Sequence, residues 1–255
     1  NFALTGDKSL LFSDSGRSFL MYRVQARSWI ALGDPVGDPN EAAQLAWEFV
    51  DAANAANARP VFYEVAADNL ALWAEMGLAM HKMGEEAVVS LSDFSLEGSH
   101  RKKLRTAYNR AGRDGLSFEM LNAPVDDATM DVLQQISDQW LEDKNSSEKQ
   151  FSVGRFDKDY LRQFPIAVVR HDGRIVAFAN VLRTEIKETA TIDLMRHVSD
   201  APSGLMDYLF TTLMLSLKED GFSKFSLGMA PLSGLEGRRG GRWTTKLGAL
   251  VYRHG

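Results

Sequence analysis

A basic segment from Ser99 to Arg113 is the sharpest charge pattern in the sequence. It contains six Lys and Arg residues and no acidic residue. On a helix, with about 100° of rotation per residue, these cations fall on one side and the apolar residues on the other. Such a helix packs one face and presents the other to phosphate groups of RNA or of anionic lipids, although a merely solvated helix face is the alternative. The six cations are Arg101, Lys102, Lys103, Arg105, Arg110 and Arg113.

A second candidate lies in the apolar stretch from Thr191 to His197, which contains Asp193 and Arg196. An aspartate within an apolar strand must be solvated, paired or functional, because burying a bare carboxylate is costly. Regular strand alternation places Asp193 and Arg196 on opposite faces. They share a face only if the strand ends or bulges near Met195. An ordinary ion pair is the alternative interpretation. His197 could act as a general base, although a lone histidine is more often structural.

Composition excludes several chemistries. The chain has 255 residues and no cysteine, which rules out disulfides, zinc–thiolate sites and cysteine nucleophiles. The five histidines are scattered without a His-Glu-x-x-His pair, so we expect no catalytic metal. A net charge of −5 means that any nucleic-acid-binding surface must be local. No apolar run approaches the roughly 20 residues of a membrane helix. The chain begins at Asn1 without an initiator methionine, so we expect a piece of a longer protein.

Hydrophobic periodicity predicts a mixed α/β architecture in two parts. The first part alternates apolar strands with amphipathic helices. An Asp-Gly pair at 172–173 predicts a hairpin in the second part. We expect a first domain over 1–98, a basic linker helix over 99–115 and a second domain over 116–255. The predicted strands are 18–24, 28–32, 61–65, 86–91, 116–121, 166–170, 175–182, 189–195, 224–229 and 247–252. The predicted helices are 41–58, 70–76, 126–141 and 205–217, besides the basic segment.

Several blocks together resemble one known family, and they run in family order along nearly the whole chain. Among them are Ser28-Trp29-Ile30-Ala31-Leu32-Gly33-Asp34-Pro35-Val36-Gly37, Ser137-Asp138-Gln139-Trp140-Leu141, Glu148-Lys149-Gln150-Phe151-Ser152-Val153-Gly154-Arg155-Phe156 and Asp193-Leu194-Met195-Arg196. The blocks around Asn180 and Ser233 continue the pattern. On these residues the sequence resembles the soluble domain of the multiple peptide resistance factor family, the aminoacyl-phosphatidylglycerol synthases.

The resemblance implies two tandem acetyltransferase-like (GNAT-type) domains joined by the basic helix, with no cofactor. An Arg/Gln-x-x-Gly-x-Gly/Ala cradle, typical of CoA-binding acetyltransferases, does not follow any predicted strand, which agrees with this expectation. The resemblance further implies transfer of an aminoacyl group from the acceptor stem of aminoacyl-tRNA to phosphatidylglycerol. This reaction lowers the negative charge of the membrane and gives resistance to cationic antimicrobial peptides. The implied partners are aminoacyl-tRNA, the anionic membrane surface and an upstream membrane domain. The implied location is the cytoplasmic side of a bacterial inner membrane.

The resemblance also implies roles for particular residues. Asp193 and Arg196 match the family's functional Asp-x-x-Arg positions and are the predicted catalytic pair. Asp193 could hold the α-ammonium group or assist the hydroxyl, and Arg196 could hold a phosphate with its two-pronged guanidinium. Asn180, Ser233 and the six cations of the basic segment are predicted to bind substrate.

Two alternatives to this function stay open. One is a peptidoglycan-bridge aminoacyltransferase, and the other is a non-catalytic module that binds tRNA or anionic membranes. An ordinary CoA-dependent acetyltransferase is the least favoured interpretation. Alanine is weakly favoured over lysine as the transferred amino acid.

Overall fold

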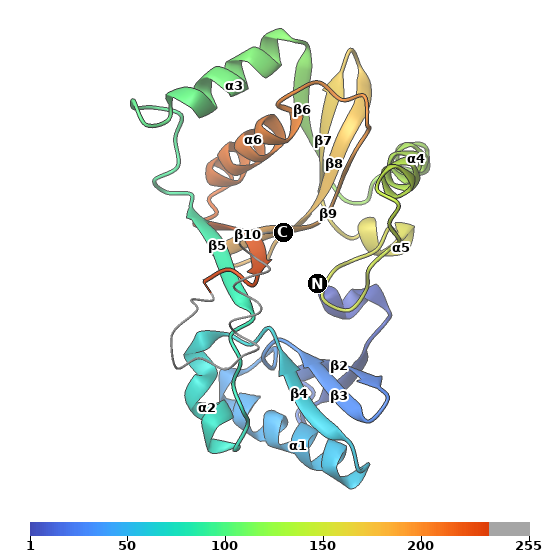
Figure 1. The fold of residues 1–255 in the computed structure, drawn as a ribbon, viewed down its shortest axis with the longest axis vertical. Coiled ribbons are helices and arrows are strands. Elements are labelled where there is room, and N and C mark those ends of the chain that lie inside the picture. Colours follow the sequence, from blue (N-terminus) through green and yellow to red (C-terminus); the bar gives the residue numbers. More distant parts are fainter. Residues whose placement is uncertain (235–255) are drawn as a thin grey trace. The chain divides into compact units, whose positions relative to one another are not determined.

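The structure, a computed structural model, describes residues 1–234 (Figure 1). The chain forms two units, which are described separately. Among the described residues, unit 1 contains 1–84, 150–152 and 231–234, and unit 2 contains 85–149 and 153–230. The strand predicted over 247–252 lies outside the described residues.

Unit 1 is built on a four-stranded sheet with the order β1-β2-β3-β4. The first two strand pairs are antiparallel, whereas β3 and β4 are parallel and are connected through helix α1. Leu20, Ala31, Leu45 and Phe49 form the core between this sheet and α1. The elements are β1 (Ser9–Phe12), β2 (Phe19–Gln25), β3 (Ser28–Leu32), α1 (Ala42–Ala55), β4 (Arg59–Tyr63) and α2 (Leu70–Glu75), with 3-10 turns at Phe2–Thr5, Pro39–Glu41 and Ala67–Asn69.

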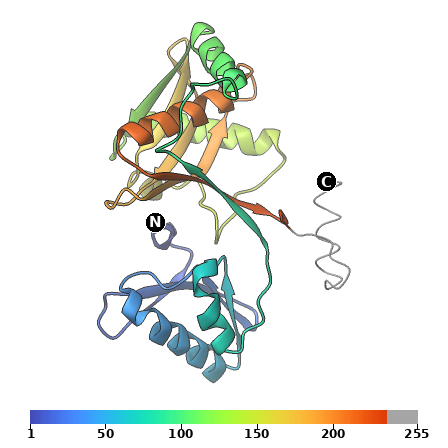
Figure 2. The same cartoon turned by 90° about the vertical axis from the view of Figure 1, so that its left-hand side faces the viewer.

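Unit 2 is built on a six-stranded sheet with the order β5-β10-β9-β8-β7-β6. Helices α3 and α6 cover one face of this sheet, and α4 and α5 lie on the other (Figures 1 and 2). Strands β6 to β9 pair antiparallel, and β10 runs parallel to β9. The elements are β5 (Gly84–Ser90), α3 (Lys102–Arg113), β6 (Leu116–Leu121), α4 (Asp127–Asp143), α5 (Lys158–Leu161), β7 (Ile166–His171), β8 (Arg174–Leu182), β9 (Thr189–His197), α6 (Leu205–Glu219) and β10 (Lys224–Pro231).

Local sequence explains the two long helices of unit 2. The side chain of Asp126 accepts a hydrogen bond from the Thr129 N–H and thereby caps the first turn of α4. Helix α6 buries seven residues on a wide apolar face against the sheet, and Gly221 follows its end with a positive φ of 88°. The two helices therefore bury their apolar faces on opposite sides of the central strands.

The α/β class predicted from the sequence is confirmed, but the units divide differently from the expected domains. The basic helix α3 is not a separate linker, because it belongs to unit 2 and packs on α6, where the rings of Tyr108 and Tyr208 stack at 5.3 Å. Strand β5 lies in the sheet of unit 2, so the residues after Gly84 belong to that unit rather than to the first domain. The boundary consequently falls at residue 84/85 instead of 98/99.

Two further observations concern membrane spans and metals. Within residues 1–234, no helix combines the length and the apolar character that crossing a membrane requires. The same residues contain no group of three His, Asp or Glu side chains placed to hold a metal ion.

Candidate functional site

A bulge in β9 brings the predicted catalytic pair to one side of the sheet. Opposite β8, the pairing passes from Ala179↔Met195 to Val181↔Ile192, so β9 contains one residue more than its partner. The extra residue shifts the alternation of side chains along the strand. Asp193 and Arg196 therefore line the same cavity. Without the bulge, regular alternation would place the two side chains on opposite faces of the strand.

Asn180 on β8 stabilises this bulge. It is completely buried, and its Oδ1 accepts a hydrogen bond of 2.7 Å from the Leu194 N–H, a backbone group at the bulge itself. Its Nδ2 is buried and has no hydrogen-bond partner among residues 1–234. The structure thus gives Asn180 a structural role beside Asp193, while its predicted contact with substrate stays a prediction.

The Asp193 carboxylate is oriented by two donors from the polypeptide. Its Oδ1 accepts a hydrogen bond of 2.7 Å from the Gly154 N–H, and its Oδ2 accepts one of 3.1 Å from the Tyr160 hydroxyl. Burial, the negative charge of Asp193 and the hydrogen bond to it raise the pKa of Tyr160 well above its ordinary value, while the Asn180 amide acts in the opposite direction. Tyr160 is therefore a protonated donor at neutral pH, and Asp193 is held in one orientation.

The Arg196 guanidinium is held within the protein on three sides. It lies over the ring of Trp140 at 4.3 Å, donates from Nη2 to Glu148 at 3.2 Å and donates from Nη1 to the Met195 carbonyl at 3.1 Å. Only 12% of its side chain is exposed. Burial lowers the pKa of Arg196, and the negative charges of Glu148 and Asp193 oppose this shift. Each terminal nitrogen thus donates one of its two N–H groups within the protein, and the predicted two-pronged grip on a phosphate stays a prediction.

Residues 144–157, which we name the strap, form one wall of the site. Glu148 accepts hydrogen bonds from the Phe156 N–H at 3.0 Å and from Arg196, and Gly154 donates to Asp193. Within unit 1, Phe151 donates its N–H to Asp7 at 3.0 Å, and its ring lies beside Tyr63. The strap is irregular in backbone conformation, but these contacts fix it at several points.

The cavity between the strap, α4 and β9 measures about 210 Å³. All of its lining residues belong to unit 2. Asp193 is the one carboxylate among them, and Arg196 and Lys149 are the cations. The lining residues are Trp140, Leu141, Ser146, Ser147, Lys149, Val153, Gly154, Asp193, Leu194 and Arg196.

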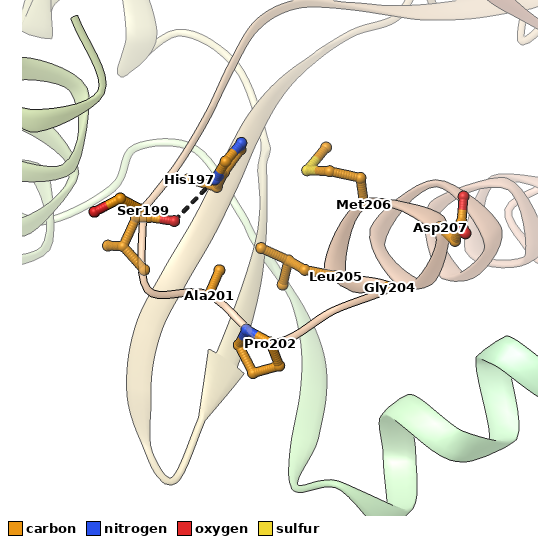
Figure 3. A pocket seen from close by; sticks show the side chains of 9 residues that line it. His197, Ser199, Ala201, Pro202, Gly204, Leu205, Met206 and Asp207 are labelled. Atoms are coloured by element: carbon orange, nitrogen blue, oxygen red, sulfur yellow. Dashed lines mark hydrogen bonds between the residues drawn. The ribbon is translucent and has the colours of Figure 1, made fainter. Parts of the chain in front are cut away.

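A second cavity, of about 270 Å³, lies between the end of β9 and the start of α6 (Figure 3). His197 lines it, with its Nδ1 at 2.9 Å from the Val198 carbonyl oxygen. Because a carbonyl only accepts, Nδ1 carries the proton in this contact. Side chains alternate along β9, so His197 faces α6 whereas Arg196 faces α4. We assign the candidate site to the smaller cavity, because it contains the oriented carboxylate and because His197 lies outside it.

The six cations of the basic segment fall into two groups, according to whether they have a partner within the protein. Arg101 lies over the Phe94 ring at 5.5 Å, Arg105 donates to the carbonyl oxygens of Leu96 and Gly98, and Arg110 pairs with Asp114 at 3.2 Å. These three have partners within the protein. The other three are exposed and form no ion pair among residues 1–234. They are Lys102, Lys103 and Arg113.

The remaining predicted residue, Ser233, is buried and belongs to unit 1, so it is not part of the cavity around Asp193. Sequence reasoning missed Tyr160, Glu148, Trp140 and Gly154 as residues of the site. Glu148 and Gly154 stood in a block quoted for the family resemblance, which was the available signal. Trp140 stood in another such block, Ser137-Asp138-Gln139-Trp140-Leu141. Tyr160 had no signal, because the four-residue helix that carries it is too short to show a period.

The fold and the cavity define an α/β protein with an oriented carboxylate at the bulged strand of a mixed sheet. The profile of the family described as "Phosphatidylglycerol lysyltransferase, C-terminal" matches residues 1–255. The chain is 37% identical over 250 residues to the phosphatidylglycerol lysyltransferase of Bacillus subtilis (strain 168), covering 98% of this chain and 29% of that protein. It is 34% identical over 251 residues to the Staphylococcus aureus (strain MSSA476) protein of the same name, covering 98% and 30%. The chain therefore belongs to this family and spans less than a third of these relatives.

Solved structures agree with this assignment. L-PGS from Bacillus licheniformis matches with a TM-score of 0.89 and 36% identity, covering 99% of this chain and 76% of that one. A C-terminal domain (DUF2156) from Agrobacterium fabrum matches with a TM-score of 0.87 and 49% identity, covering 89% and 72%. FemX matches with a TM-score of 0.58 but only 11% identity, covering 97% and 85%, and shows a shared fold alone. The family resemblance found in the sequence motifs is thus confirmed.

Proposed function

We propose that this chain transfers an aminoacyl group from aminoacyl-tRNA to a glycerol hydroxyl of phosphatidylglycerol. The relatives' names support the lipid acceptor and a lysyl group. The tRNA donor rests on the sequence resemblance and on the exposed cations of α3. The observation in the structure that carries the proposal is the Asp193 carboxylate, which two donors orient inside a cavity large enough for an amino acid side chain.

The chemistry follows from an ester that is already activated. The lipid hydroxyl attacks the ester carbonyl, a new carbon–oxygen bond forms, the bond to the tRNA ribose breaks, and the hydroxyl proton passes to the ribose oxygen. The protein has to position both partners and stabilise charge, so no ATP is required. We assign to Asp193 the binding of the positively charged ammonium of the aminoacyl group, because a carboxylate is its natural partner.

The contacts of Arg196 support a positioning part for it, beside the phosphate contact predicted from the sequence. Its guanidinium donates hydrogen bonds to Glu148 and to the Met195 carbonyl oxygen, and it lies over the ring of Trp140. We therefore assign it to positioning the strap and shaping the cavity. A lysine could not replace it, because a point charge cannot stack on the ring and bridge two acceptors at once.

The amino acid is tested directly by offering alanyl-tRNA and lysyl-tRNA in parallel and analysing the lipid extract. The names of the relatives favour lysyl, whereas the weak preference from the sequence was alanyl. Aminoacylated phosphatidylglycerol supports the proposal. Label in a cell-wall precursor instead of the lipid fraction would indicate a peptidoglycan-bridge transferase.

The Asp193→Asn variant tests the site, because it keeps the volume and removes the charge. We expect transfer to fall at least about tenfold, equivalent to roughly 1.4 kcal/mol of barrier, with tRNA binding and melting temperature preserved. Asp138→Asn, at an exposed position of α4, is the matched control and should transfer normally. Loss of binding without a separate loss of turnover would favour a non-catalytic binding module.

A further inference from the structure

The cavity contains one cation that the protein itself does not neutralise. Of its two positively charged lining residues, Arg196 pairs with Glu148 and covers Trp140. Lys149 is exposed and forms no ion pair with any residue of the described chain. An anionic group that enters the cavity therefore meets Lys149, rather than Arg196, as its available counter-charge.

Lys149 does not stand alone at this position. Ser146 and Ser147 also line the cavity and are exposed, so two hydroxyl groups and one ammonium lie on the same stretch of the strap. The neighbouring residue Glu148 fixes this stretch, because its two carboxylate oxygens bind the Phe156 N–H and Arg196. The three polar groups are thus presented by an anchored segment, in which the Ser146 hydroxyl also donates to the Ser147 carbonyl oxygen at 3.5 Å. The partly buried Asp193, on β9, lines the same cavity.

We propose that Lys149, Ser146 and Ser147 form a subsite for the phosphodiester of the lipid acceptor. This inference rests on the proposed function and names the part of the site that holds the acceptor. In a phosphatidylglycerol headgroup the reacting hydroxyl is separated from the phosphodiester by a single glycerol unit. A cavity of about 210 Å³ holds only the reacting ends of two large substrates, and ordinary ligand cavities start near 300 Å³. Along the lipid, the anion nearest to the reacting hydroxyl is this phosphate.

The charge of Lys149 also distinguishes substrate from product. The lipid substrate carries one negative charge, and the transferred amino acid adds at least one positive charge next to it. Lys149 therefore attracts the substrate more strongly than the product, which favours release of the product from the cavity.

Lys149→Ala tests the subsite, with Lys149→Arg as the charge-preserving variant and Lys144→Ala as the matched control. Lys144 is an exposed lysine of the same strap that does not line the cavity. The readouts are KM for a water-soluble short-chain phosphatidylglycerol, KM for an aminoacyl-RNA, and kcat. We expect Lys149→Ala to raise the lipid KM about three- to fivefold, with kcat and the RNA KM changed by less than about twofold. Lys149→Arg and Lys144→Ala should resemble the wild type.

Equilibrium binding of the same short-chain lipid, measured without any aminoacyl donor, separates the subsite from the proposed function. Weaker binding to Lys149→Ala supports the subsite even if the wild type transfers no amino acid. Equal lipid KM and equal binding for Lys149→Ala and Lys144→Ala would overturn it. A rise in the RNA KM alone would assign the subsite to the nucleic acid and would contradict the lipid assignment.

Discussion

The orientation of the Asp193 carboxylate depends on residues that do not themselves react. Gly154 approaches the carboxylate so closely that a Cβ at this position would overlap Asp193 Oδ2. A glycine is therefore needed here for its lack of a side chain, since the short N–H contact requires close approach of the backbone. The orientation of the carboxylate depends on Gly154 as much as on Tyr160.

Gly154→Ala should accordingly impair transfer without unfolding the protein. The added methyl group must displace either the strap or the carboxylate, and both changes break the hydrogen bond of 2.7 Å. We expect transfer to fall by at least about tenfold, equivalent to roughly 1.4 kcal/mol. The control is Gly112→Ala in α3, where a Cβ meets nothing within 4 Å. Wild-type turnover in Gly154→Ala, with an unchanged melting temperature, would show that this contact does not matter.

At the scale of elements, the sequence identified most strands and helices, but of the strand pairings it predicted only the hairpin of β7 and β8. Strand β6 and the hairpin of β7 and β8 follow the predicted ranges closely, because alternation and an Asp-Gly turn are local signals. Strand β1 and the short helix α5 were missed, since Ser9–Phe12 and Lys158–Leu161 are too short to show a period.

The bulge in β9 marks the limit of what the sequence could show. Spacing alone left Asp193 and Arg196 on opposite faces, and the deciding contact is the one between Asn180 and the Leu194 N–H. Asn180 and Leu194 are 14 residues apart in the sequence, so no local pattern contains this contact. Pairing between strands is a tertiary property, so the residues alone marked Asp193 and Arg196 as candidates, and only the family resemblance joined them into one site.

Helix α3 permits a prediction that separates binding from stability. Lys102, Lys103 and Arg113 form no ion pair among residues 1–234, so changing all three to alanine should weaken binding of RNA or anionic vesicles. The slope of log affinity against log salt should fall by up to about two, at roughly 0.7 for each single-strand phosphate contact. Binding measured across a salt series checks this, and an unchanged slope for both ligands would exclude α3 from binding.

Arg105→Ala is the contrasting variant on the same helix. Its guanidinium donates to the Leu96 carbonyl at 2.5 Å and to the Gly98 carbonyl at 3.2 Å, so its loss leaves two acceptors of the preceding loop without this donor. We expect a lower melting temperature and a smaller change in the salt slope than in the triple variant.

At the scale of the whole molecule, charge and site location restrict how the donor can bind. The chain carries a net charge of −5, so an extended RNA footprint over its surface is unfavourable, and attraction must come from local cations such as those of α3. The cavity around Asp193 is lined only by residues of unit 2 and is too small for more than the acylated end of the donor. Under the proposed function, recognition should therefore concentrate on the acceptor end of the tRNA.

A short aminoacylated RNA hairpin that reproduces the acceptor stem should consequently replace intact tRNA. We expect its kcat/KM to lie within about threefold of that of the full tRNA. A threefold ratio corresponds to roughly 0.7 kcal/mol of transition-state stabilisation, which is less than the loss of a main contact would cost. The measurement is transfer to short-chain phosphatidylglycerol with each donor at equal salt. A hairpin carrying a hydroxy acid in place of the amino acid is the control. It lacks the ammonium that we assign to Asp193, so it should react poorly with the wild type and lose little further activity in Asp193→Asn. A hairpin that fails while intact tRNA works would show that the protein reads RNA far beyond the acceptor end.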